Sequence, residues 1–158
     1  MPVGLYSVGP ANGSIANGDT VVLCAPRAAA LLGNARGYLG SGQCSTGTDP
    51  LLKLVVAVAG DVVDVGTRAI AVNGRCLGAS ETFDRDGKGR PLPHVARGSY
   101  RLKRGELWLW GPATHSFDSR YFGAVEAADV TNIAKPFAVW PAPAVPAFGS
   151  GPCPLTSL

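Results

Sequence analysis

The chain has 158 residues, enough for a single domain, and 46% of them are hydrophobic while only 16% are charged. This balance supplies apolar material for a core and excludes an intrinsically disordered protein. A net charge of +3 without a basic run argues against a nucleic acid partner, and the 21 glycines and 13 prolines favour a loop-rich β architecture over long helices.

The start of the chain has no targeting signal. Met1-Pro2-Val3-Gly4 has neither the charged start nor the apolar segment of a signal peptide. No stretch of the sequence reaches the ~18 consecutive apolar residues that a membrane span needs. We expect a domain cut from a longer protein to begin in this abrupt way.

Short apolar or β-branched segments predict strands in the first half of the chain. They are residues 20–24, 51–59, 62–65, 69–72 and 75–77. Between the first two, residues 27–32 predict a short helix that ends at Gly33-Asn34, and a Gly/Ser/Thr-rich loop follows over 40–49. Asn73-Gly74 has the chemistry of a tight hairpin turn between the last two strands.

The second half continues the β pattern. Residues 84–90 are charged and rich in glycine; they lack the later acidic ligands of a calcium loop and predict a hairpin turn. Residues 100–102 and 106–110 are predicted to pair across a Lys-Arg-Gly turn. One more strand is expected within 122–133, and the chain after Pro136 is proline-rich with little propensity for either structure.

The four cysteines are Cys24, Cys44, Cys76 and Cys153. They include no CxxC pair and no metal-ligand spacing, so we expect no metal site and no cofactor. In an oxidising compartment they would form one or two disulfides, and three connectivities are open. Cys24–Cys44 is the favoured bridge because these two residues flank a compact insertion.

Lys53 differs from the other lysines because apolar residues surround it on both sides, from Leu51 to Val56. Burial of an ammonium group is costly, so such a lysine tends to lose its proton. A neutral amine can act as a general base, which an exposed lysine cannot. The alternative is a lysine whose charged end reaches solvent from the end of an edge strand.

Ser116, Asp118 and Arg120 lie within the segment 116–123. Arg120 can hold the Asp118 carboxylate through two hydrogen bonds, and such a network can orient a neighbouring lysine or hydroxyl. The same residues can also form a purely structural corner.

In their order along the chain, these motifs resemble the successive boxes of bacterial signal peptidase I. The boxes are Gly18-Asp19-Thr20-Val21-Val22, Lys53 with Gly60-Asp61-Val62-Val63, and Ser116-Phe117-Asp118-Ser119-Arg120-Tyr121-Phe122-Gly123. The resemblance is closer to the conjugative-transfer branch, the TraF-type peptidases that mature pilin subunits. The segments similar to that branch are Pro2-Val3-Gly4-Leu5-Tyr6, Pro50-Leu51-Leu52-Lys53, Gly89-Arg90-Pro91-Leu92-Pro93 and Gly105-Glu106-Leu107-Trp108. Together they cover residues 1–124.

The resemblance implies a fold and a domain organisation. The fold is mainly β: a signal-peptidase-like antiparallel β domain over residues 1–140. A small helical insertion at about 26–50 is expected to carry the short helix and the Cys24–Cys44 bridge. Residues 141–158 are expected to form a proline-rich C-terminal tail.

The resemblance also implies a serine–lysine mechanism, in which a serine attacks the scissile carbonyl and a neutral lysine takes its proton. Lys53 matches the general base of the family, in agreement with the burial argument above. Ser116 matches a serine that orients that lysine. Asp118 and Arg120 match the supporting network of the last box.

The nucleophilic serine of the family comes just before the Pro-x-Gly-Leu-Tyr segment, which places it immediately before Met1. We therefore expect the nucleophile and a membrane-anchoring helix upstream of Met1, and a polypeptide that begins at Met1 is expected to be inactive. Ser7 and Ser14 lie on the wrong side of the motif to replace it. His94 and His115 are expected in loops, and a serine–lysine mechanism needs no histidine.

The implied function is that of a membrane-anchored serine endopeptidase at the periplasmic face of the bacterial inner membrane. Its partner is a pilin precursor of a conjugation or type IV secretion system, which it cleaves near small residues; some relatives in the family then join the pilin ends into a ring. Nucleic acid is not an expected partner, and no oligomeric state is predicted. The alternatives are a housekeeping signal peptidase I, a self-cleaving repressor-type protease, and a non-catalytic scaffold of the conjugation machinery.

Overall fold

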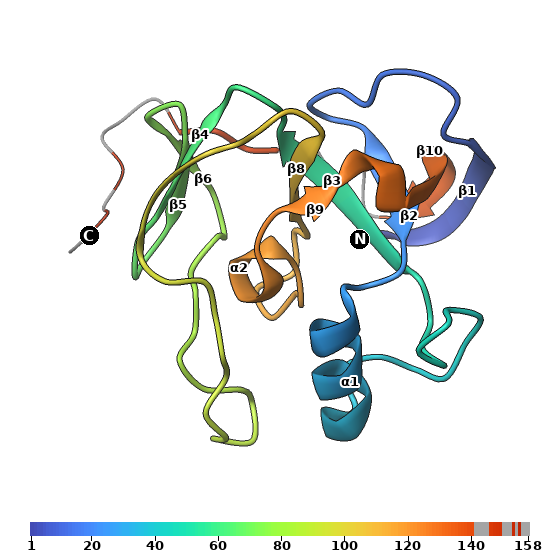
Figure 1. Ribbon diagram of the computed structural model, residues 1–158, viewed down its shortest axis with the longest axis horizontal. Coiled ribbons are helices and arrows are strands. Elements are labelled where there is room, and N and C mark those ends of the chain that lie inside the picture. Colours follow the sequence, from blue (N-terminus) through green and yellow to red (C-terminus); the bar gives the residue numbers. More distant parts are fainter. Residues whose placement is uncertain (141–145, 150–152, 154, 156–158) are drawn as a thin grey trace.

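The computed structural model describes residues 1–140, 146–149, 153 and 155, and in these residues two antiparallel sheets form the body of the protein (Figure 1). The larger sheet has six strands in the order β1 (Val3–Pro10), β10 (Val130–Trp140), β2 (Thr20–Leu23), β3 (Leu51–Ala57), β8 (Glu106–Trp110) and β9 (Val125–Glu126). The smaller sheet has four strands in the order β6 (Arg75–Leu77), β5 (Ile70–Val72), β4 (Val62–Val65) and β7 (Gly98–Arg101). The short helices α1 (Arg27–Arg36) and α2 (Ser119–Phe122) and a 3-10 turn, η1 (Ala127–Asp129), complete the elements. The prediction of a mainly β fold is confirmed.

Side chains alternate along β3 and β8, and this alternation divides the core into two hydrophobic clusters, one on each face of the larger sheet. Val55 and Leu109 belong to the cluster that includes Ala30 of α1 and Phe117. Leu54 and Trp108 belong to the cluster shared with the smaller sheet. Both faces of β3 and β8 are therefore buried, which explains why these strands are almost continuously apolar.

The predicted strands 20–24, 51–59, 62–65, 69–72 and 75–77 are all present, with ends shifted by one or two residues. The predicted hairpin turn at Asn73-Gly74 is confirmed: both residues have positive φ, and β5 pairs with β6 across them. The turn predicted within 84–90 is also confirmed, because Arg85 and Pro91 form an antiparallel bridge.

Helix α1 is longer than predicted, because Gly33 lies inside the helix and does not end it. The missing side chain of Gly33 leaves room for Leu39, whose Cδ1 would lie 2.8 Å from a Cβ at this position. The helix ends at Gly37, which has a left-handed conformation and a φ of 73°, and the Tyr38 N–H donates to the Gly33 carbonyl oxygen over 2.7 Å. Residues 38 and 39 therefore turn back toward the helix.

The predicted hairpin between residues 100–102 and 106–110 is wrong. Strand β7 pairs with β4 in the smaller sheet, whereas β8 pairs with β3 and β9 in the larger one. The charged turn between the two strands has local hairpin chemistry. However, Leu107 to Trp110 are all buried, so β8 needs neighbours and cover on all sides, which an interior position in the larger sheet provides.

The pairing of β1 with β10 was not predicted from the sequence. Strand β10 continues through Pro136 to Trp140, so the expectation of little structure after Pro136 is wrong up to residue 140. Pro136 lies opposite Tyr6, where the register shifts between Leu5 and Tyr6. A bulge is a position that tolerates a proline in a strand.

Two disulfides, Cys24–Cys44 and Cys76–Cys153, link segments that are 20 and 77 residues apart in the sequence. The favoured Cys24–Cys44 bridge is confirmed. The first bridge joins the start of α1 to the loop before β3. The tail predicted for 141–158 lies largely outside the described residues, but its described part contacts the smaller sheet: the Gly149 N–H donates to the Cys76 carbonyl oxygen over 2.9 Å. None of the helices in the described part of the chain is long and apolar enough to cross a membrane.

Candidate active site

Lys53 lies in the middle of β3, on the same side of the strand as Leu51 and Val55, and only 9% of its surface is exposed. Its Nζ donates a hydrogen bond to the Ser116 Oγ over 2.7 Å. Burial lowers the pKa of Lys53; the Asp118 carboxylate opposes this shift, and the Arg120 guanidinium adds to it. The alternative of a solvent-reaching lysine on an edge strand does not fit, because β3 is an interior strand.

Asp118 and Arg120 form a fully buried ion pair beside this lysine. The Arg120 Nε donates to Asp118 Oδ1 over 2.8 Å, and its Nη2 donates to Oδ2 over 2.9 Å. The remaining guanidinium donors reach the carbonyl oxygens of Glu81, Ser116 and Thr114. The paired charges are thus satisfied by hydrogen bonds, as a buried ion pair requires.

Hydrogen bonds hold Ser116 at both its backbone carbonyl and its side-chain hydroxyl. Its carbonyl oxygen accepts a hydrogen bond from Arg120 over 3.0 Å, and its hydroxyl accepts one from Lys53. The ion pair itself is anchored to the end of β8, because the Gly111 N–H donates to Asp118 Oδ2 over 3.0 Å. The structure therefore brings together the four residues of the predicted site, Lys53 from β3 and Ser116, Asp118 and Arg120 from the segment that leads into α2.

Gly111 makes this close packing possible. A Cβ at this position would lie 2.2 Å from the Ser116 Oγ and 3.4 Å from the Lys53 Nζ. Sequence reasoning missed this residue; the only signal was a glycine that follows the apolar strand directly and precedes Pro112.

The Lys53 amine and the Ser116 side chain line a cavity of about 490 Å³. Its other walls are mainly apolar and aromatic, with Leu39, Leu51, Leu92 and Phe117 among them. Met1 also lines this cavity, and burial together with the Lys53 charge lowers the pKa of the Met1 amino group. In Figure 1 the N-terminus accordingly lies next to β3.

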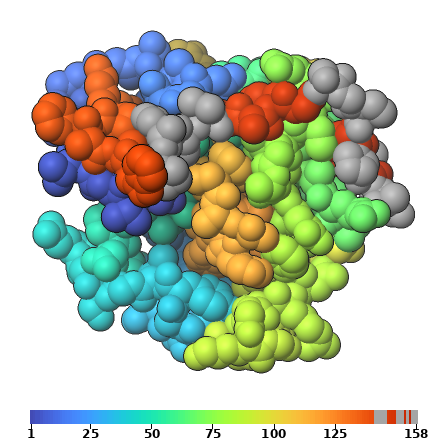
Figure 2. Space-filling model, turned by 180° about the vertical axis from the view of Figure 1, so that it is seen from behind, coloured from blue at the N-terminus to red at the C-terminus, as the bar shows by residue number. Residues whose placement is uncertain are grey.

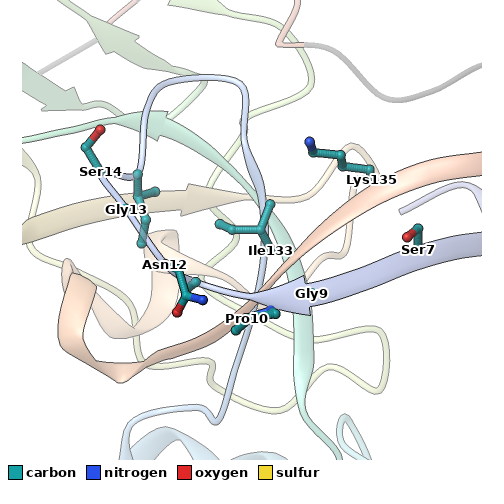
Figure 3. A pocket seen from close by; sticks show the side chains of 10 residues that line it. Ser7, Gly9, Pro10, Asn12, Gly13, Ser14, Ile133 and Lys135 are labelled. Atoms are coloured by element: carbon teal, nitrogen blue, oxygen red, sulfur yellow. The ribbon is translucent and has the colours of Figure 1, made fainter.

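Ser7 and Ser14 are not part of this arrangement. They line a separate pocket of about 360 Å³ next to the β1–β10 pair, where Figure 3 shows Ser7 and Lys135 on the two paired strands. Ser7 is opposite Lys135 in the register, but Lys135 is exposed and lacks the burial that distinguishes Lys53. This second serine–lysine pair therefore lies at the surface and not in a buried site.

The two histidines lie in loops, as predicted. His94 bonds through Nε2 to Asp84, which is 66% exposed, and it lies outside the set of residues that line the Lys53 cavity. His115 is exposed at the rim of the cavity, where its ring packs against Phe83 at 5.1 Å.

Comparisons with known proteins agree with this geometry. Residues 2–140 match the family described as signal peptidase, peptidase S26. A probable conjugal transfer protein TraF of Sinorhizobium fredii (strain NGR234) is 38% identical over 135 residues, which are 85% of this chain and 70% of that protein. A plasmid transfer protein TraF of Escherichia coli is 34% identical over 142 residues, 89% of this chain and 79% of that protein.

Two further similarities complete the comparison. A conjugal transfer protein TraF of Agrobacterium tumefaciens is 35% identical over 136 residues, 85% of this chain and 76% of that protein. A solved signal peptidase I from Enterococcus faecalis V583 is similar over 75% of this chain and 94% of its own, with a TM-score of 0.44 and 19% identity. The family match and the TraF relatives show that this chain belongs to the TraF-type branch of the peptidase S26 signal peptidase family.

Proposed function

We propose that this chain is the catalytic domain of a serine endopeptidase that processes a conjugative pilin precursor by a serine–lysine mechanism. The observation that supports this proposal most strongly is the environment of Lys53. This lysine is buried, its pKa is lowered, and it is hydrogen-bonded to Ser116. It also lines a cavity large enough for a peptide side chain. The TraF names of the relatives support the conjugative substrate.

We place the attacking serine immediately before Met1 in the native protein. Met1 lines the same cavity as Lys53, and its amino group is close enough for the Lys53 charge to act on its pKa. A residue joined to that nitrogen would follow on from a residue that lines the Lys53 cavity. This position agrees with the motif order of the family, and it makes a polypeptide that begins at Met1 inactive.

In the proposed reaction, the neutral Lys53 amine takes the proton of the serine hydroxyl while the serine oxygen attacks the scissile carbonyl carbon. The ammonium then returns this proton to the nitrogen of the leaving segment, and an ester to the enzyme remains. Water opens the ester to give a cut chain, or an amino group of the same substrate opens it to give a ring. Ser116 positions Lys53 throughout, and the Asp118–Arg120 pair positions Ser116.

The location that we propose is the periplasmic face of the inner membrane, with the anchor in the segment before Met1. Disulfides persist in oxidising compartments such as the periplasm, and the structure has two.

The test is Lys53→Met in the full-length protein, with cleavage of purified pilin precursor followed by mass spectrometry. Methionine keeps the volume of the side chain but removes the base, so we expect the rate to fall by about 10²–10⁴-fold. Lys135→Met is the matched control: it changes the other lysine that faces a serine, and we expect full activity.

Cleavage at the normal rate by Lys53→Met would contradict the proposal and favour the non-catalytic scaffold. Normal protein levels in both variants are required for the comparison.

A further inference from the structure

The cavity next to Lys53 has one wall that the proposed chemistry does not use. This wall is formed by two segments far apart in sequence: residues 38 and 39 after α1, and residues 83–92. Figure 2 shows these segments meeting at the surface, the first in cyan and the second in yellow-green. The helical insertion and the 84–90 turn therefore close the cavity together.

The cavity is large and its lining as a whole is mainly apolar, although Arg85 and Asp86 also line this side. Leu39, Leu92 and Phe83 line it together with Lys53, and its volume is about 490 Å³. A closed apolar cavity of about 150 Å³ already holds benzene. The space therefore exceeds what an alanine or glycine side chain would fill and suits a leucine or aromatic side chain.

A polar cluster joins the two segments within this wall, because Tyr38 and Asp86 both line the cavity. The Tyr38 hydroxyl donates to Asp86 Oδ2 over 2.5 Å, and the Arg90 Nε donates to the same oxygen over 2.6 Å. The other oxygen, Oδ1, accepts the N–H groups of Lys88 and Arg90 over 2.9 and 3.0 Å and so shapes the turn. Asp86 belongs to the 84–90 turn, and its carboxylate thus connects this turn to Tyr38.

Further contacts reinforce the junction. The Arg36 Nη1 donates to the Pro91 carbonyl oxygen over 2.6 Å, and the Arg90 guanidinium lies over the Tyr38 ring at 5.7 Å. The Tyr38 hydroxyl and the Arg90 side chain hold the pKa of Asp86 well below its usual range, although burial opposes this shift. The carboxylate stays ionised at neutral pH, and so the junction persists there.

We infer that this cavity is a substrate subsite for a bulky apolar side chain near the scissile bond, and that Tyr38 and Asp86 are positioning residues that set its outer wall. The role of this subsite in cleavage rests on the proposed peptidase function. The binding of a peptide side chain to the cavity does not depend on that function. The small residues expected next to the bond would be accompanied by one large apolar residue that enters this space.

The first test measures binding to the chain itself, by methyl NMR of its leucines and isoleucines. The probes are two capped peptides, Ala-Ala-Leu-Ala-Ala and Ala-Ala-Ala-Ala-Ala. We expect the leucine peptide to shift the Leu39 and Leu92 methyl signals and to bind at least ten times more tightly than the alanine peptide. Equal binding of the two peptides, or shifts confined to Ile133 in the other pocket, would overturn the subsite.

Two variants locate the effect. Ala113 is exposed and lines the cavity, so Ala113→Phe fills the space from outside and should abolish the preference for leucine. Tyr38→Phe removes only the hydroxyl that reaches Asp86 and should weaken leucine-peptide binding about three- to tenfold, with no effect on the alanine peptide. Ile133→Ala is the control in the other pocket and should change neither. A preference that survives Ala113→Phe would overturn the inference.

The second test uses the full-length peptidase and fluorogenic peptides with leucine or alanine at the same position. Tyr38→Phe should raise KM for the leucine substrate and leave kcat unchanged, which a general loss of folding would not do. Leucine-selective binding without any cleavage would overturn the proposed function and support the subsite. Cleavage with no difference in KM between the two substrates would overturn the subsite and support the proposed function.

Discussion

Lys53 and its neighbours show a polar site built inside an apolar strand. Leu51 and Val55 lie on the same side of β3 as Lys53, and the Lys53 amine donates a hydrogen bond to the Ser116 hydroxyl. Such a site opposes stability, because the charged form of the lysine is desolvated. We explain a lysine at this unfavourable position by its proposed role as the general base.

This cost predicts that Lys53→Met is more stable than the wild type. The pKa of Lys53 is lower in the folded than in the unfolded protein, so the unfolded chain binds more protons between the two values, and stability rises with pH across that window. At pH 7 the methionine variant should gain roughly 1 kcal/mol or more, and it should lose this rise with pH. Urea unfolding between pH 6 and 10 measures both effects.

A variant that is less stable than the wild type at pH 7 would instead indicate a structural lysine. The opposite signs of the effects on activity and on stability are what separate the two roles.

The Asp118–Arg120 pair predicts the reverse effect on stability. Asp118→Asn leaves the Arg120 charge buried without its partner, and removal of one member of a buried pair costs about 3–5 kcal/mol. Asp84→Asn is the control, because it breaks the ion pair with Arg97 at a carboxylate that is 66% exposed, where about 1 kcal/mol or less is expected. Similar unfolding free energies for the two variants would refute a structural role for the buried pair.

At the scale of elements, α1 and its flanking loop depend on a covalent link. Cys24 and Cys44 are 20 residues apart, and together they close the insertion that supplies Tyr38 and Leu39 to the cavity. The fully buried side chains of its helix are small, Ala29 and Ala30, and its larger apolar residues Leu32, Tyr38 and Leu39 are only partly buried against the core. The disulfide therefore matters for the position of the cavity wall.

Replacement of both cysteines, Cys24→Ser with Cys44→Ser, is expected to cost about 3 kcal/mol, the value for a loop of this size. We expect amide hydrogen exchange in α1 and in residues 37–49 to accelerate, whereas exchange in β3 and β8 stays slow. Unchanged exchange in α1 would show that packing alone holds the insertion.

The elements differ in how well the sequence predicted them. Strands β2 to β6 were predictable because short apolar runs alternate with turn residues over a few positions. The pairing of β8 was mispredicted, because a local turn does not reveal that Trp108 and Trp110 must pack against the smaller sheet. Strand β1 was missed because it is an exposed edge strand: its partner β10 lies more than a hundred residues away, and no buried alternation marks it.

At the scale of the whole molecule, the site is assembled from parts that the sequence keeps apart. Lys53 and the 116–120 segment could be singled out from motifs, because their residue types point to a chemistry. The cavity could not be predicted, because its walls come from the start of the chain, the insertion, the 83–92 turn and the α2 region. Contacts of the 83–92 turn with Arg36, Tyr38 and Tyr121 bring these walls together.

We propose that a serine joined to Met1 reacts with Lys53 as its base. The most direct measurement compares two polypeptides that differ by one added residue before Met1, serine in one and alanine in the other, for cleavage of pilin precursor followed by mass spectrometry. We predict cleavage by the serine form alone, and loss of that cleavage on Lys53→Met. Equal cleavage by both forms, or by neither when both are folded, would contradict the claim.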